Sequence, residues 1–172
     1  MIQAEKVNCR RCRDSSHPNF GIRGRGEIKI MTVLERSDYR ALQSNYEKEL
    51  FKSGTGRTLK KILDGYLDNT LITNTHKCLL KEGRRVPKAS EFVNCLPHLR
   101  EQAARYRPRL VLCLGAQAAR AFYPEQPFVK VVNKISNIER GQILVLHHPR
   151  RMEVWEKKRA RRVVIKTMRQ SG

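Results

Sequence analysis

Apolar residues in this chain form short runs that alternate with longer stretches of helical periodicity. The short runs, the first of which begins with an alternation of polar and apolar residues, are typical of buried strands. They predict strands at residues 27–34, 69–74, 109–114 and 143–147. A further short strand is indicated around residues 129–132.

In the longer stretches apolar residues recur every three or four positions, which is typical of amphipathic helices. Pro97 lies inside one of them and should kink the helix or mark a restart, because proline lacks the backbone donor. Residues 35–54 show no clear pattern. Strands that alternate with helices predict an α/β fold with a mostly parallel sheet. The expected helices span residues 55–67, 89–106, 116–122 and 151–169.

Chemistry in such sheets is found at the carboxyl ends of the strands. In this chain these ends carry Glu35, Asn74, Gly115 and His148. Because the carboxyl ends of parallel strands meet at one edge, we expect these four residues to contribute to one site.

Length and charge narrow the function further. The 172 residues are most simply one domain spanning the whole chain. The chain has 36 Lys and Arg against 16 Asp and Glu, a formal charge of +20. Such an excess indicates a polyanionic partner, and we expect nucleic acid rather than a merely solubilising surface. No apolar run is long enough to span a membrane, and the N-terminus has no apolar signal core. We therefore expect a cytoplasmic protein that is not secreted. We also expect a monomer.

Four of the five cysteines have the arrangement of metal ligands. Cys9 and Cys12 form a CxxC pair, and Cys78 and Cys95 are separated by a basic loop. In an intracellular protein these thiols favour an iron–sulfur cluster or a structural zinc over disulfides. Either metal would clip the polar segment 1–26 onto the body. Cys113 lies in an apolar strand and is expected to be a buried core thiol.

The order of several motifs resembles the iron–sulfur uracil-DNA glycosylases, sometimes called family four of the uracil-DNA glycosylase superfamily. The strongest match is ITNTHKC, followed by the basic loop and Cys95. RPRLVLCLGAQA, HHP and FKSGTGRTL are similar to further motifs of the family. The resemblance runs from Cys9 to about Trp155. These motifs occupy residues 72–78, 107–118, 147–149 and 51–59.

The resemblance implies a three-layer α/β/α fold around a mostly parallel four-stranded sheet, and a monofunctional glycosylase that flips uracil, or a related damaged pyrimidine, out of DNA. By the same resemblance Phe51 stacks on the base, and Asn74 reads its edge with an amide donor and acceptor. His148 hydrogen-bonds the uracil oxygen as charge develops, Met152 is the apolar wedge that fills the gap in the stack, and Glu35 orients or deprotonates water.

Further expectations concern the cofactor and the DNA backbone. The resemblance implies a [4Fe–4S] cluster on Cys9, Cys12, Cys78 and Cys95, with zinc as the alternative. Basic residues beside the ligands and after the HHP motif would contact phosphates. In the DNA-backbone set we include Arg84, Arg85, Arg150 and Arg151.

One motif departs from the family. Where the family has GEAPG, this chain reads Leu34-Glu35-Arg36-Ser37-Asp38, so only the glutamate is retained. The loss of both glycines and the proline leaves a second hypothesis open, a glycosylase-like chain that binds DNA without catalysis. A third hypothesis, a zinc-ribbon-like nucleic-acid module, gives no reason for Asn74 or His148. Each residue named for the base pocket also has an ordinary structural interpretation, as a core, turn or loop side chain.

Overall fold

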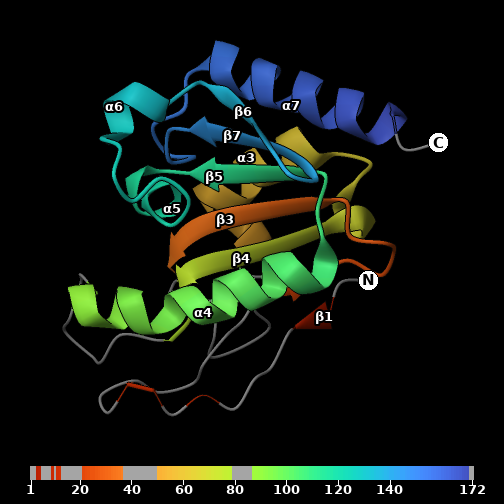
Figure 1. Ribbon diagram of the computed structural model, residues 1–172. Coiled ribbons are helices and arrows are strands. Elements are labelled where there is room, and N and C mark those ends of the chain that lie inside the picture. Colours follow the sequence, from red (N-terminus) through yellow and green to blue (C-terminus); the bar gives the residue numbers. More distant parts are fainter. Residues whose placement is uncertain are drawn as a thin grey trace.

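A computed structural model of the protein describes residues 3–4, 9, 11–12, 21–36, 50–78 and 87–170. Its centre is a sheet of seven strands in the order β1-β2-β4-β3-β5-β7-β6 (Figure 1). Three short strands extend a longer core of four. The strands are β1 (Gln3–Ala4), β2 (Ile22–Arg23), β3 (Ile30–Arg36), β4 (Thr70–His76), β5 (Leu110–Leu114), β6 (Ile135–Ile138) and β7 (Gly141–Leu146).

The four core strands are the ones that the hydrophobic pattern predicts. β4, β3, β5 and β7 are parallel, and Leu34 of β3 pairs with Asn74 of β4 while Leu114 of β5 pairs with Leu146 of β7. β1, β2 and β6 join this core by antiparallel pairing. The expected α/β fold with a mostly parallel sheet is therefore confirmed, with a sheet wider than four strands.

Helices cover both faces of the sheet, which gives three layers. One face is covered by α3 (Gly54–Leu63) and α7 (Val154–Arg169), and the other by α4 (Ala89–Tyr106), α5 (Ala116–Arg120) and α6 (Phe128–Val131). A short 3-10 helix, η1 (Leu67–Asn69), precedes β4. No helix in the described part of the chain combines the length and apolarity that a membrane crossing requires.

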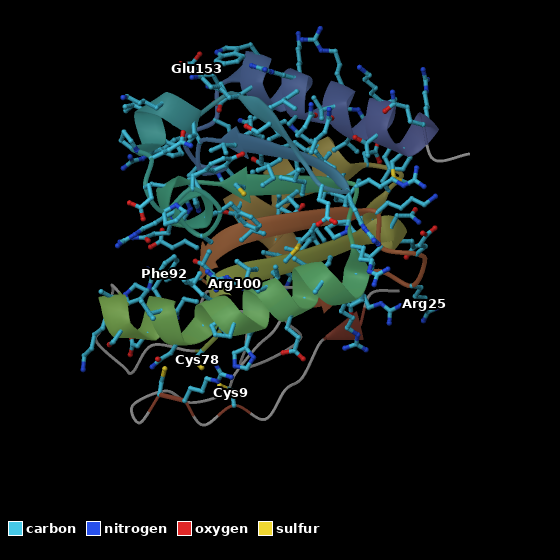
Figure 2. All side chains as sticks on the ribbon, viewed as in Figure 1. Cys9, Arg25, Cys78, Phe92, Arg100 and Glu153 are labelled. Carbon is cyan, nitrogen blue, oxygen red and sulfur yellow. The ribbon has the colours of Figure 1, made fainter. Side chains whose placement is uncertain are left out.

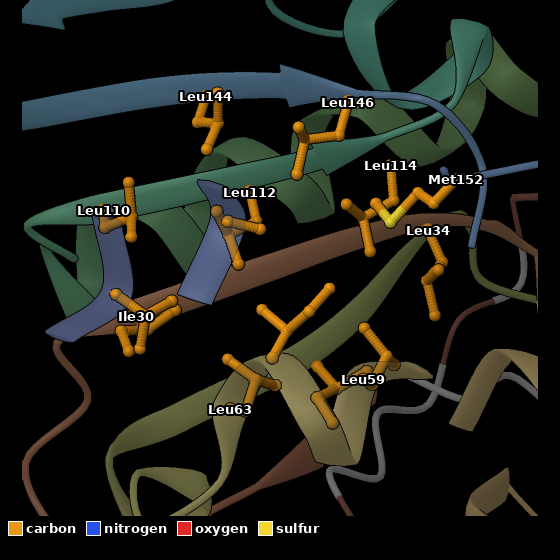
Figure 3. Packing of buried hydrophobic residues seen from close by; sticks show 14 of the residues in the cluster. Ile30, Leu34, Leu59, Leu63, Leu110, Leu112, Leu114, Leu144, Leu146 and Met152 are labelled. Carbon is orange, nitrogen blue, oxygen red and sulfur yellow. The ribbon is translucent and has the colours of Figure 1, made fainter. Parts of the chain in front are cut away.

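Alternation along the strands divides the core between these two faces. Ile30 and Leu34 of β3 pack with α3 and α7, whereas Met31 and Val33 pack on the side of α4 and α5. This is the period of two expected of a strand that is buried on both faces. Figure 3 shows the first of these clusters, in which leucines of the sheet meet Leu59 of α3.

The expected strand at residues 129–132 needs correction, whereas the expected helix at residues 89–106 is confirmed. Residues 128–131 form the short helix α6 and not a strand, because Phe128 and Val131 point into the core at a helical spacing while Val129 is 78% exposed. α4 runs through Pro97 as one helix from Ala89 to Tyr106, without a restart.

The first turn of α3 is fixed by a close backbone approach. Ser53 caps the helix by accepting a hydrogen bond from the backbone N–H of Gly56, at 3.0 Å. A side chain at Gly56 would overlap the backbone of Leu50 and Phe51. Only glycine fits there, and this contact sets where Phe51 lies relative to the sheet.

Candidate active site

The residues expected at the carboxyl edge of the sheet come together as predicted. Glu35 lies near the end of β3, and Asn74 lies on the adjacent strand β4. Gly115 follows β5, and its backbone N–H donates to the carbonyl of Leu146 in β7 at 2.9 Å. His148 follows β7 directly. The four parallel strands thus present these residues side by side along one edge.

His148 is half-buried and packs against the end of β5. Burial lowers the pKa of its imidazole below the ordinary value of 6.5, and Arg150 and Arg151 lower it further, whereas Glu35 raises it. A β-carbon placed at Gly115, whose φ is +101°, would lie 3.5 Å from the Cβ of His148. Glycine at this position therefore serves both the left-handed backbone and the close packing of the histidine loop.

A hydrogen bond defines how the neutral ring of His148 is oriented. The backbone N–H of Arg150 donates to Nδ1 of His148 at 3.3 Å. Because Nδ1 accepts this bond, the proton of the neutral ring resides on Nε2. His148 can then donate an Nε2–H hydrogen bond to a ligand without carrying a charge.

Asn74 and Phe51 lie on the face of the sheet that α3 and α7 cover. Asn74 is fully buried, and its strand position alternates with that of Leu71 and Thr73, which lie on the α4 face. Phe51 is half-buried and packs against the same core cluster as Leu34 and Leu59. The buried amide at the strand end could hydrogen-bond a ligand, and the aromatic ring on the same face could pack against it.

Glu35 lies one residue beyond the buried part of β3. Its backbone carbonyl accepts a hydrogen bond from the Thr75 hydroxyl at 2.7 Å, which ties the end of β3 to β4. The side chain is half-buried, and its carboxylate acts on the pKa of His148. The carboxylate is therefore within electrostatic reach of the imidazole.

Met152 does not have the exposure that a wedge requires. It is 5% exposed and belongs to the core cluster, beside Leu34 and Leu114 in Figure 3. A side chain that fills a gap in a base stack must reach out of the protein surface. In this structure Met152 is a core residue.

The basic residues expected at the DNA backbone can be placed only in part. Arg150 and Arg151 are exposed beside His148, on the loop that leads to α7. This position would allow both to contact phosphates next to a bound base. Arg84 and Arg85 lie outside the described residues.

A buried glutamate anchors the histidine loop. Glu156, in the first turn of α7, is 1% exposed and accepts hydrogen bonds from the backbone N–H and from Nδ1 of His147, both at 3.0 Å. The ring of His147 also contacts Phe128 edge to face. His147 is thus held away from the site, and the backbone that precedes His148 is fixed to α7.

The expected metal ligands lie around α4. Cys95 on α4 and Cys78 after β4 are both buried, and Cys9 and Cys12 are half-buried. Burial raises the pKa of Cys95 to about 11; the backbone N–H of Lys77 lowers this pKa, and the nearby charges of Cys78 and Cys12 raise it, so both thiols are within electrostatic reach of Cys95. Figure 2 labels Cys9 and Cys78 on the same side of α4.

Polar groups contact three of the four sulfurs. The backbone N–H of Lys77 donates to Sγ of Cys95 at 3.4 Å, the amide of Asn94 donates to Cys12 at 3.5 Å, and Sγ of Cys9 lies 3.2 Å from Nε2 of His98. Four thiols with N–H donors are a donor set that suits an iron–sulfur cluster. In the part of the chain that the structure describes, no group of three His, Cys, Asp or Glu side chains is arranged so that it could hold a metal ion.

Comparison with known protein families decides the family of the chain. The sequence model of the uracil DNA glycosylase superfamily matches residues 38–169, which is most of the chain. The chain belongs to the uracil DNA glycosylase superfamily. Among curated proteins, none matches the chain. Membership in the superfamily supports a DNA repair hydrolase of the glycosylase type, with DNA as its substrate.

The region that the superfamily model matches includes only some of the expected site residues. It contains Phe51, Asn74 and His148, and it begins after Glu35. Cys9 and Cys12 also precede the match, whereas Cys78 and Cys95 lie inside it. Of the residues expected to bind or attack the base, Glu35 alone precedes the matched region.

Sequence reasoning did not identify Glu156 or Gly115 as residues that position the site. Glu156 could have been found as the second glutamate of the ExxE pattern at residues 153–156, which forms a capping box at the start of α7. Gly115 was expected at the same edge of the sheet as His148, but not as the residue against which His148 packs. Its contact with His148 joins two strands that lie far apart in the sequence, and no local pattern carries that information.

Proposed function

We propose that this member of the superfamily hydrolyses the N-glycosidic bond of uracil, or of a related damaged pyrimidine, in DNA. The observation that carries the proposal is the neutral His148, with its Nε2–H free to donate at the edge where Asn74 and Glu35 also lie. Asn74 is buried, His148 is hydrogen-bonded through Nδ1, and Glu35 is half-buried. The three side chains could therefore bind a base and stabilise the charge that develops as it leaves.

The spacing of the strands suits a single base. Neighbouring strands are about 4.8 Å apart, so β4 and β7, which are separated by β3 and β5, lie about 14 Å apart at this edge. Asn74 on one side and His148 on the other can then reach a flipped pyrimidine from opposite ends. Gly115, which has no side chain, leaves space between them.

The chemical step needs charge stabilisation and a positioned water. As the bond between the sugar carbon C1′ and the base nitrogen N1 breaks, its electron pair passes to the base, and negative charge develops on the uracil oxygen. The Nε2–H of His148 donates to this oxygen. A water that Glu35 orients adds to C1′ and gives its proton to the Glu35 carboxylate. The uracil anion then takes up one proton, so that the products are the free base, an abasic sugar and the regenerated carboxylate.

Asn74 and Phe51 would serve recognition. The Asn74 amide offers a donor and an acceptor side by side, which matches the hydrogen-bonding edge of uracil. Its burial and its place in a strand hold this pattern rigid. Phe51 would supply the stacking face, since its position is set by the close contact between Gly56 and the preceding backbone.

We further propose that Cys9, Cys12, Cys78 and Cys95 hold a [4Fe–4S] cluster, with a structural zinc as the alternative. The proximity of Cys12, Cys78 and Cys95 and the N–H donors at two sulfurs support a shared site. The metal would have a structural role, tying the segment that precedes β2 to α4. No step of the proposed reaction depends on it.

Single-turnover release of uracil from an oligonucleotide, with abasic sites cleaved by alkali, tests the function. His148→Ala should lower the rate constant about a hundred- to a thousand-fold, as loss of a donor to developing charge does elsewhere. Asn74→Ala should weaken both recognition and rate, and Glu35→Gln should lower the rate if the carboxylate handles water. Asn137→Ala, an exposed asparagine on β6, is the matched control and should behave as wild type.

The same experiment distinguishes an enzyme from a binding protein. If the wild type binds uracil-containing DNA tightly but releases no uracil from either single or double strands, the enzyme assignment for uracil fails. The non-catalytic binder then becomes the leading hypothesis, and it is the altered sequence at residues 34–38 that gives this alternative its weight.

A further inference from the structure

Beyond its first two residues, the outward face of α7 is basic. Ala160, Val164 and Thr167 turn inward and are buried. The opposite face consists of exposed cations spaced four, four and three residues apart, which places them in one row. These cations are Lys158, Arg162, Lys166 and Arg169, and we call this row the α7 stripe.

Two features show that the α7 stripe is not an ordinary solvated surface. Within the described residues none of its four cations takes part in an ion pair. The one acidic residue of α7, Glu156, is buried against His147. Like charges four residues apart weaken a helix, and of the four cations only Lys166 and Arg169, in the last turn, are favoured by the helix dipole.

Exposed apolar side chains begin the same helix. Val154 is 67% exposed and Trp155 is 47% exposed. They line a shallow surface hollow of about 590 Å³ together with Met152, Glu153 and Lys158, the first cation of the stripe. The indole N–H of Trp155 donates to Glu153 at 2.6 Å, which holds the ring in place.

The hollow and the stripe lead away from the candidate active site. α7 starts six residues after His148, at the carboxyl edge of the sheet, and crosses the molecule towards the opposite edge (Figure 1). Its 16 residues extend about 24 Å. A strand that leaves the site past Arg150 and Arg151 would therefore meet the aromatic ring first and the row of cations next.

We infer that this face of α7 binds the single-stranded DNA that flanks the target nucleotide, with a base stacked on Trp155 and phosphates along the α7 stripe. An exposed aromatic ring beside a row of cations is the combination that binds unpaired strands. A duplex hides the faces of its bases and is too stiff to turn from the sheet edge onto the helix. The inference rests on the proposed function in taking DNA as the substrate.

The chain contains a single tryptophan, which makes Trp155 its own probe. Adding an oligonucleotide of thymidines alone, which contains no uracil, should quench tryptophan fluorescence in a saturable way. The corresponding duplex should quench it much less. Absence of quenching by the single strand, or equal quenching by the duplex, would overturn the inference.

Variants with labelled DNA test the two components separately. Trp155→Ala should weaken single-strand binding about tenfold, within the range known for one stacked base, while Trp155→Phe should retain most of the affinity. Changing all four stripe cations to glutamine should reduce the slope of log affinity against log salt by about 3, since each phosphate contact contributes about 0.7.

A matched control separates the stripe from the total charge. Its four members are exposed cations on other surfaces, Arg100, Lys130, Lys134 and Arg140, and they are also changed to glutamine. Equal losses of affinity and slope in the two variants would refute a specific role for α7. Because His148→Ala should retain the quenching of Trp155, failure of catalysis and failure of this surface give different results.

Discussion

At the scale of single residues, the proposed chemistry depends on the protonation of His148. The backbone N–H of Arg150 occupies Nδ1, and burial with two nearby arginines disfavours the charged ring. A neutral ring that donates from Nε2 stabilises developing charge without first forming an ion pair with Glu35. The local environment of this histidine therefore favours the state that the reaction needs.

The lowered pKa of His148 predicts the acid limb of the pH profile. Protonation would add a proton at Nδ1, which now accepts a hydrogen bond, so it should disrupt the loop and lower the rate. Since burial lowers the pKa of His148 below 6.5, the single-turnover rate constant should fall on the acid side with a midpoint below pH 6.5. Rates measured across this range at saturating enzyme would check it; an inflection at or above pH 6.5 that His148→Ala removes would contradict it.

At the scale of elements, the first turn of α7 acts as the support of the histidine loop. Glu156 accepts two hydrogen bonds from His147, and its second oxygen lies 3.4 Å from the backbone N–H of Glu153. The loop between β7 and α7 is thus closed at both ends. One buried carboxylate, that of Glu156, therefore fixes the geometry of this loop and with it the position of His148.

Glu156→Ala should therefore affect both stability and rate. Removing the acceptor leaves the part-buried backbone N–H of His147 without its partner, which costs about 1–3 kcal/mol of unfolding free energy. The single-turnover rate should fall about tenfold or more because His148 is no longer held, while affinity for DNA should change little. Thermal unfolding and single-turnover assays measure the two effects, and Glu156→Gln, which retains an acceptor oxygen, should recover part of the rate. A full rate in a destabilised Glu156→Ala protein would refute the positioning role.

At the scale of the whole molecule, the cysteines connect segments that are distant in sequence. Cys9 and Cys12 lie between β1 and β2 in the sequence, Cys78 follows β4 and Cys95 lies on α4. A shared metal would join the two-residue strands β1 and β2 to the body more firmly than their few backbone hydrogen bonds can. The proposed cluster is thus a matter of tertiary stability.

Purified protein should accordingly be brown, with broad visible absorption and about four irons per chain. Cys95→Ser should lose most of the iron and unfold at a lower temperature. Cys113→Ser is the control, because Cys113 is buried in β5 away from the other thiols; it should retain the iron. Metal analysis and visible spectra decide the question, and a colourless protein with one zinc would replace the cluster by the alternative metal.

The sequence by itself determined the four parallel strands, the full extent of α4 and the edge where Asn74, Glu35 and His148 meet. It could do so because burial on both faces requires continuous apolar runs, and because parallel strands place their carboxyl ends together. The motifs around these ends also indicated the superfamily that the comparison confirmed. Each of these features depends on a pattern of a few neighbouring residues.

Only the tertiary structure decided which side chains of similar character are buried and which are exposed. Met152 and Trp155 lie three residues apart, yet one packs between β3 and β5 and the other faces solvent. Residues 128–131 are β-branched enough for a strand, but their contacts with the core select a helix. The strands β1 and β2 are too short to have a pattern, and they form because β2 pairs with β4 and β1 pairs with β2. In each case the deciding contact comes from a segment distant in the chain, which no local pattern contains.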